Sequence, residues 1–209
     1  MSDHYCCKRC GLRYDDCRCP AHTEAPRMVE QKVSPESLLS RMEVVMAGGH
    51  IKRYHMKRTL YSQTVGEHSG RVANLVQLVH PGCSADLLKA ALMHDTSELS
   101  TGDVASPVKW ANPLLASELN RITNEYEERF GLRMAITEDE AGLLKWADYA
   151  EGNLFCIDEM LLGNRNMVGT FHRYHGALTK LRLHPDDTIA RNQRVINKEL
   201  ETRGMRLCQ

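Results

Sequence analysis

The sequence lacks any long apolar run. Its uninterrupted apolar stretches span only a few of the 209 residues, whereas a membrane-spanning helix needs about 20. It also lacks net charge, because 27 basic residues balance 27 acidic ones, so no positive excess indicates duplex nucleic acid or an anionic membrane as a partner. The polar N-terminus lacks the basic-then-apolar layout of a secretory signal. These absences predict a soluble, cytoplasmic protein.

Strand-like patterns are absent as well. The sequence contains no alternating run of β-branched residues, no internal repeat and no low-complexity tract. Apolar residues instead recur at spacings of three and four, which is typical of amphipathic helices. The sequence therefore predicts an all-α body over residues 34–209, with helices over about 34–48, 67–80, 84–95, 112–130, 137–163 and 185–204. Ser34 before Pro35 and the pair Thr137 and Glu140 are the expected helix starts.

Residues 1–33 differ from this body. Five of the eight cysteines fall within the first 19 residues, and in a chain without an export signal such a cluster favours a metal site over disulfides. The pattern Cys-x2-Cys-Gly followed by Cys-x-Cys-Pro predicts a small zinc knuckle with four thiolate ligands: Cys7, Cys10, Cys17 and Cys19. Three alternatives stay open: Cys6 or His4 replaces one ligand, the segment is a reduced tail without metal, or the knuckle contacts nucleic acid.

The most informative motif of the body is the doublet His94-Asp95 at the end of an apolar helical run. A neutral imidazole beside a carboxylate suits a borderline divalent ion. Two further candidate ligands lie on other expected helices, with His68 26 residues before His94 and Asp148 53 residues after Asp95. Two imidazoles and two carboxylates from three helices can converge on one ion in the core of a bundle.

This H…HD…D order resembles that of the HD-domain metal-dependent phosphohydrolases, which are helical bundles. The resemblance is closer to their 5′-deoxynucleotidase branch, and four strings carry it: Val65-Gly-Glu-His-Ser69, His94-Asp-Thr-Ser-Glu-Leu-Ser-Thr-Gly-Asp103, Pro107-Val-Lys109 and Lys145-Trp-Ala-Asp148. Arg53-Tyr54 stands where that branch has Arg followed by an aromatic residue, more often Trp. The resemblance covers residues 36–165 and leaves the Cys-rich segment outside.

Carried over by position, the resemblance implies a metal site and a nucleotide site. It assigns the metal to four ligands: His68, His94, Asp95 and Asp148. It implies that Glu98 is a general acid/base for the attacking water and that Asp103 positions this water or protonates the leaving oxygen. Arg53 and Lys109 would hold the phosphate, and Tyr54 would stack or pack on the nucleoside. From the residues alone, two alternatives stay open: Glu98 is a solvated carboxylate, and Asp103 is a turn residue.

The implied activity is hydrolysis of deoxynucleoside 5′-monophosphates to deoxynucleoside and phosphate. Histidine and carboxylate ligands suit several divalent transition metals without selecting one; the resemblance favours Co²⁺ or Mn²⁺, leaves Zn²⁺ open and implies a homodimer. Two other functions stay open: a dATP-type triphosphohydrolase, as in related phage proteins, and a nucleic-acid-binding or regulatory module with a vestigial HD core. An intact ligand set argues against the last.

Overall fold

The structure is a computed structural model that describes residues 36–209, and this part of the chain is all-α, as predicted. The Cys-rich segment lies outside the described residues, together with the four predicted zinc ligands Cys7, Cys10, Cys17 and Cys19. Residues 36–209 form nine α-helices and one 3-10 helix: α2 (Leu38–Gly48), α3 (Val65–Val79), α4 (Ala85–Met93), α5 (Glu98–Thr101), α6 (Ser106–Ala111), α7 (Pro113–Phe130), α8 (Glu138–Leu161), η3 (Arg165–Met167), α9 (Val168–Leu178) and α10 (Asp187–Cys208).

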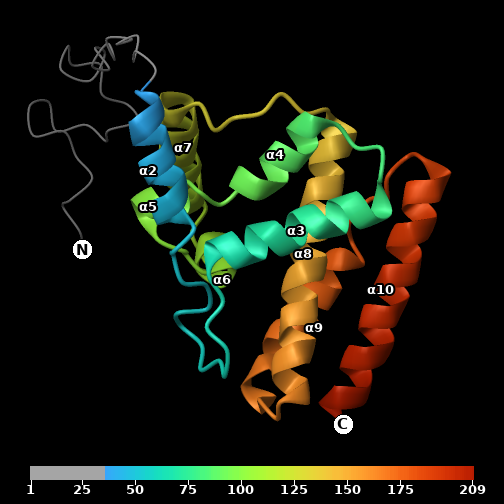
Figure 1. Ribbon diagram of the computed structural model, residues 1–209. Helices are drawn as coiled ribbons and strands as arrows, with labels where there is room; N and C mark the ends of the chain where they lie inside the picture. The colour runs from blue at the N-terminus through green and yellow to red at the C-terminus, as the bar shows by residue number, and fades with distance from the viewer. Residues whose placement is uncertain (1–35) are drawn as a thin grey trace, which may run out of the picture. The chain divides into compact units, whose positions relative to one another are not determined.

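The long helix α8 is the centre of the bundle. Its start is fixed by the predicted capping box, in which Thr137 and Glu140 satisfy each other's backbone N–H groups. It packs against α3, α4, α9 and α10, and α3 crosses it (Figure 1). Trp146 is fully buried and donates its indole N–H to Asn197 Oδ1 of α10 at 2.9 Å. Because α8 is covered from several sides, polar side chains that it points inward must find partners within the protein.

Two glycines allow α9 to approach its neighbours closely. A Cβ added to Gly152 of α8 would lie 2.5 Å from the ring of Tyr174, and one added to Gly204 of α10 would lie 2.0 Å from the ring of Phe171. Phe171 is fully buried, so its ring cannot move aside without disturbing the core. The close packing of α9 against α8 and α10 therefore depends on these two residues having no side chain.

The first helix differs from its prediction. It begins at Leu38 rather than after Ser34, because Ser37 is the N-cap and its Oγ accepts a hydrogen bond from Ser40 N. The apolar stripe of α2 is not core: its large members Leu38, Leu39, Met42 and Met46 are all more than half exposed.

Three other helices also differ from the prediction. Helix α3 starts at Val65, two residues earlier than predicted, because Thr64 and Glu67 form a capping box that the sequence analysis overlooked. In α4, Leu87 and Ala91 are buried as expected, but Leu92 is 47% exposed. Helix α9 was not predicted, since residues 164–184 carry many His and Arg side chains and no clear apolar stripe.

Among residues 36–209, no helix has both the length and the apolar character required to cross a membrane.

The close packing at Gly204 leads to a stability prediction. Gly204→Ala should lower the free energy of unfolding by about 1–3 kcal/mol, since the added methyl group overlaps the buried ring of Phe171. The control is Gly142→Ala in α8, where no atom lies within 4 Å of the added Cβ; helix propensity there should raise stability by up to about 1 kcal/mol. Urea unfolding measures both. Equal stability gains in the two variants would contradict the predicted clash.

Candidate metal centre and nucleotide pocket

His68 is fully buried in the first turn of α3, where its Nδ1 is 2.6 Å from Glu151 Oε2. Burial alone would raise the pKa of Glu151, but the hydrogen bond from His68 and the charge of Arg53 lower it, so Glu151 is an ionised acceptor. Nδ1 must therefore carry the His68 proton. The lone pair of His68 Nε2 is then free on the opposite side of the ring.

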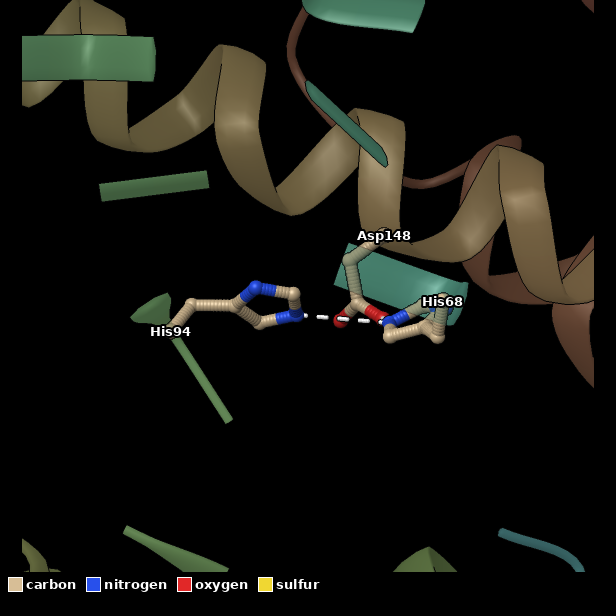
Figure 2. Close-up of side chains that lie close together, drawn as sticks. All are labelled: His68, His94 and Asp148. Atoms are coloured by element: carbon tan, nitrogen blue, oxygen red, sulfur yellow. Dashed lines mark hydrogen bonds and ion pairs between the residues drawn. The ribbon is translucent and has the colours of Figure 1, made fainter. Parts of the chain in front are cut away.

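His94 follows the last residue of α4 and mirrors this arrangement. Its Nδ1 lies 2.9 Å from the carbonyl oxygen of Ala91, which can only accept. The His94 Nε2 atom therefore also points away with a free lone pair. The two Nε2 atoms face each other at 3.3 Å (Figure 2).

Two carboxylates complete this cluster. Asp148 Oδ1 lies 3.2 Å from His68 Nε2, and Asp95 Oδ2 lies 3.3 Å from His94 Nε2. Burial opposes ionisation of Asp148, but its close contact with His68 and the charge of Lys145 hold its pKa well below the ordinary value. Burial likewise raises the pKa of Asp95, and the neighbouring His94 overcomes this and lowers it. Both groups are anionic, beside two imidazole lone pairs.

Such a set of acceptors fits a divalent cation. The ligand atoms of His68, His94 and Asp148 all lie within 4.8 Å of one another, and two ligands of a tetrahedral ion, each about 2.1 Å from it, lie about 3.4 Å apart. Without a metal, a proton supplies the positive charge: burial lowers the pKa of His94, but Asp95 and Asp148 raise it to about 9. The cluster is a divalent-metal site of the type found in HD domains.

A pocket opens beside this cluster and collects the other predicted site residues. Arg53, Tyr54, Glu98, Asp103 and Lys109 all line it, together with Asp95 and Asp148 of the metal cluster. They come from the 50–64 loop, α5, the turn after it, and α6. The structure therefore brings together every site residue that the sequence analysis predicted within residues 36–209.

Glu98 is a pocket carboxyl group with a raised pKa. Burial, and then the negative charges of Asp95 and Asp103, raise its pKa to about 8. Its Oε2 is buried and has no hydrogen-bond partner among the described residues. Glu98 can therefore carry a proton at neutral pH, beside the metal cluster.

Asp103 and Tyr54 are linked to each other. Asp103 Oδ2 accepts a hydrogen bond from the backbone N–H of Tyr54 at 3.2 Å, and Tyr54 has a φ of 56°, a left-handed conformation that costs energy for a residue with a side chain. The Tyr54 ring stacks on Phe155 with ring centroids 4.7 Å apart. Its hydroxyl donates to the hydroxyl of Tyr174 at 3.1 Å. One face of Tyr54 is therefore occupied by the protein itself.

Arg53 is held from two sides. Its Nη1 lies 3.0 Å from Gln63 Oε1 and 3.3 Å from Glu151 Oε2, and its side chain is only 10% exposed. Lys109 of α6 also lines the pocket and is half-buried.

One wall of the pocket and the supporting residue Glu151 were not predicted from the sequence. Four residues of α9 line the pocket: Thr170, Arg173, Tyr174 and Ala177. Glu151 was missed too, although it lies one helical turn after Asp148, where an i, i+3 spacing places it on the same face of α8.

Comparison with known proteins agrees with this geometry. The sequence profile of the YfbR-like 5′-deoxynucleotidases matches residues 37–130. A 5′-deoxynucleotidase of Vibrio vulnificus is 30% identical over 142 residues, which cover 56% of this chain and 73% of the relative. One of Yersinia pseudotuberculosis is 26% identical over 152 residues, which cover 61% of this chain and 77% of the relative.

Solved structures show the same fold. The HD phosphohydrolase DatZ of cyanophage S-2L, bound to dA and one catalytic Zn²⁺ ion, aligns with a TM-score of 0.60 at 21% identity, covering 81% of this chain and 99% of that one. An HD-domain phosphohydrolase of Listeria innocua aligns with a TM-score of 0.56 at 20% identity, covering 78% and 98%. The chain therefore belongs to the YfbR-like 5′-deoxynucleotidase family of HD-domain phosphohydrolases.

Proposed function

We propose that this chain hydrolyses deoxynucleoside 5′-monophosphates to deoxynucleoside and phosphate with a divalent metal as cofactor. The observation that carries the proposal is the convergence in one pocket of a metal-type cluster, a protonatable carboxyl group with a buried Oε2, and an arginine whose side chain is only 10% exposed. Hydrolysis of a phosphate ester needs charge stabilisation, positioning and proton transfer, and these groups supply all three. The family membership points to the same reaction.

Four residues would hold the metal: His68, His94, Asp95 and Asp148. When bound, the ion supplies a Lewis acid that neutralises phosphoryl charge and makes water more acidic. Their nitrogen and oxygen donors suit Zn²⁺, Co²⁺ and Mn²⁺. Zn²⁺ is the ion of the structural relative DatZ, whereas the resemblance in sequence favours Co²⁺ or Mn²⁺.

Glu98 and Asp103 would manage the protons. Glu98 has a raised pKa and a buried Oε2 with no other partner in residues 36–209, so its ionised form can accept a proton from the attacking water and its protonated form can return one. Asp103 uses Oδ2 to fix the backbone of Tyr54, which leaves Oδ1 to orient water or to protonate the 5′-oxygen as it leaves. Arg53 and Lys109 would bind the phosphate oxygens, with Arg53 offering a planar pair of donors. Tyr54 would pack against the nucleoside.

A triphosphohydrolase is the second candidate, and the surplus of cations in the pocket favours it. Lys57, Lys145 and Arg173 line the pocket in addition to the two predicted phosphate ligands. Lys145 is paired with Asp148 at 2.8 Å, but Arg173 makes its hydrogen bond to the neutral hydroxyl of Thr170. Positive charge of this extent can hold a longer phosphate chain.

Two further parts of the proposal rest on sequence alone. The resemblance to this family implies a homodimer. The spacing of Cys7, Cys10, Cys17 and Cys19 suits a tetrahedral zinc ion with a structural role, since four thiolates leave no position open for substrate.

Product analysis separates the two activities. Protein loaded with Co²⁺, Mn²⁺ or Zn²⁺ is given dAMP and dATP side by side, then AMP and ATP, and the products are resolved by ion-exchange chromatography. Orthophosphate from dAMP with dATP intact is expected. Release of intact triphosphate from dATP would establish the second candidate, and the absence of turnover with every metal would overturn both.

Removal of a metal ligand should abolish the reaction. For His94→Ala we expect phosphate release to fall at least about 100-fold and bound metal per chain to fall with it, since an imidazole donor is lost. The matched control is His172→Ala, an exposed histidine of α9 outside the cluster, which should change neither quantity. Full phosphate release by His94→Ala would show that the chemistry does not use this cluster.

The proton-transfer role of Glu98 predicts a selective defect. Glu98→Gln keeps the size of the side chain but cannot give up a proton, so kcat should fall by about 10²- to 10⁴-fold. The metal content and the KM for dAMP should stay within about threefold of wild type, because Glu98 is not in the ligand cluster. A kcat within twofold of wild type would rule out this role.

A further inference from the structure

We propose that Glu151 is a positioning residue that holds the metal ligand His68 and the phosphate-binding Arg53 in one buried network. The part that concerns His68 depends only on the metal cluster. The part that concerns Arg53 rests on the proposed function. The two parts can be measured separately.

Every contact of the Glu151 carboxylate is with a hydrogen-bond donor. Oε2 lies 2.6 Å from His68 Nδ1 and 3.3 Å from Arg53 Nη1, and Oε1 lies 2.7 Å from Gln63 Nε2 and 3.6 Å from Arg71 Nη1. Glu151 itself is only 1% exposed, so water cannot replace any of these contacts. Only an ionised carboxylate can accept hydrogen bonds from His68, Arg53 and Gln63 at once and also form an ion pair with Arg71.

The bond to His68 determines how that ring meets the metal. With its proton fixed on Nδ1, His68 keeps the Nε2 lone pair directed at His94 Nε2 and Asp148 Oδ1. A carboxylate partner also makes the imidazole a stronger donor to a metal. Among the hydrogen-bond partners of Glu151, His68 is the one that belongs to the cluster, so the direct contact of Glu151 with the metal site is through His68.

The bond to Arg53 gives its positively charged guanidinium a negatively charged partner. Gln63 is neutral, and Glu151 is the only carboxylate within 4 Å of Arg53 in the described part of the chain. Without it, the nearly buried cation would be drawn toward the anionic metal cluster, because Asp95 already acts on it electrostatically. Glu151 therefore keeps Arg53 available for a phosphate and away from the metal ligands.

The first variant is Glu151→Gln. In either orientation, the amide of a glutamine at position 151 sets its NH₂ group against a donor: His68 Nδ1 on one side, or Gln63 on the other. If Gln63 turns to accept, its own NH₂ then faces Arg53. We expect Zn²⁺ affinity, measured by competition with a chromophoric chelator, to fall about 10- to 100-fold. We also expect the KM for dAMP to rise in metal-saturated protein.

A charge swap tests the two parts separately. In the double variant Glu151→Gln with Gln63→Glu, the carboxylate at position 63 accepts from Arg53 and from the new amide, and the amide oxygen accepts from His68. The KM should return to within about threefold of wild type, because Arg53 regains an anionic partner. Zn²⁺ affinity should stay below wild type, because His68 now bonds to a neutral group. A KM no better than that of Glu151→Gln overturns the Arg53 part.

Glu159→Gln is the matched control. Glu159 is also 1% exposed on α8, but it accepts from the backbone N–H groups of Leu60 and Tyr61 and from Asn164, and contacts no metal ligand. Its replacement should lower the thermal midpoint of the metal-free protein and leave Zn²⁺ affinity unchanged. Equal losses of Zn²⁺ affinity in both single variants would show a merely structural role for Glu151. If wild type hydrolyses no nucleotide, the proposed function fails, and the Zn²⁺ titrations still decide the His68 part.

Discussion

Hydrogen-bond acceptors converge in a partly buried space where α3, α4 and α8 meet, and this arrangement favours a positive charge between them. His68 and His94 use their Nδ1 protons on Glu151 and on a backbone carbonyl, so both Nε2 lone pairs point inward with the carboxylates of Asp95 and Asp148. Buried groups of this kind are stable only when paired or ligated. The packing of these three helices therefore creates a cation site between them.

Helix geometry makes this convergence possible. The capping box at Thr64 fixes the first turn of α3 and so the height of His68, and His94 sits where α4 ends. Helix α8 contributes Asp148 to the cluster and Glu151 one turn later to the layer behind it. The same rigid helix therefore carries the metal ligand Asp148 and the residue that supports the ligand His68. This fixes the positions of the two groups relative to each other.

The pocket beside the cluster has walls of different origin. The loop 50–64, α5 and α6 contribute Arg53, Glu98 and Lys109, whose segments fall within the matched family profile. Helices α8 and α9 form the other wall and lie beyond the residues that this profile matches. Residues 37–130 thus carry most of the predicted site, whereas Asp148 of α8 and Arg173 and Tyr174 of α9 reach the same pocket from beyond the residues that the profile matches.

The sequence by itself determined the helical class, most helix starts and the metal-ligand motif, because capping residues, apolar spacing and the H…HD…D order are local or ordered along the chain. It did not reveal the short helices α5 and α6, helix α9, the exposed face of α2, or the stacking of Tyr54 on Phe155. It also gave no sign that Glu151 connects His68 to Arg53, which precede it by 83 and 98 residues. Only tertiary structure decides such contacts, because they depend on which helix faces pack together and not on the spacing of residues within any one helix.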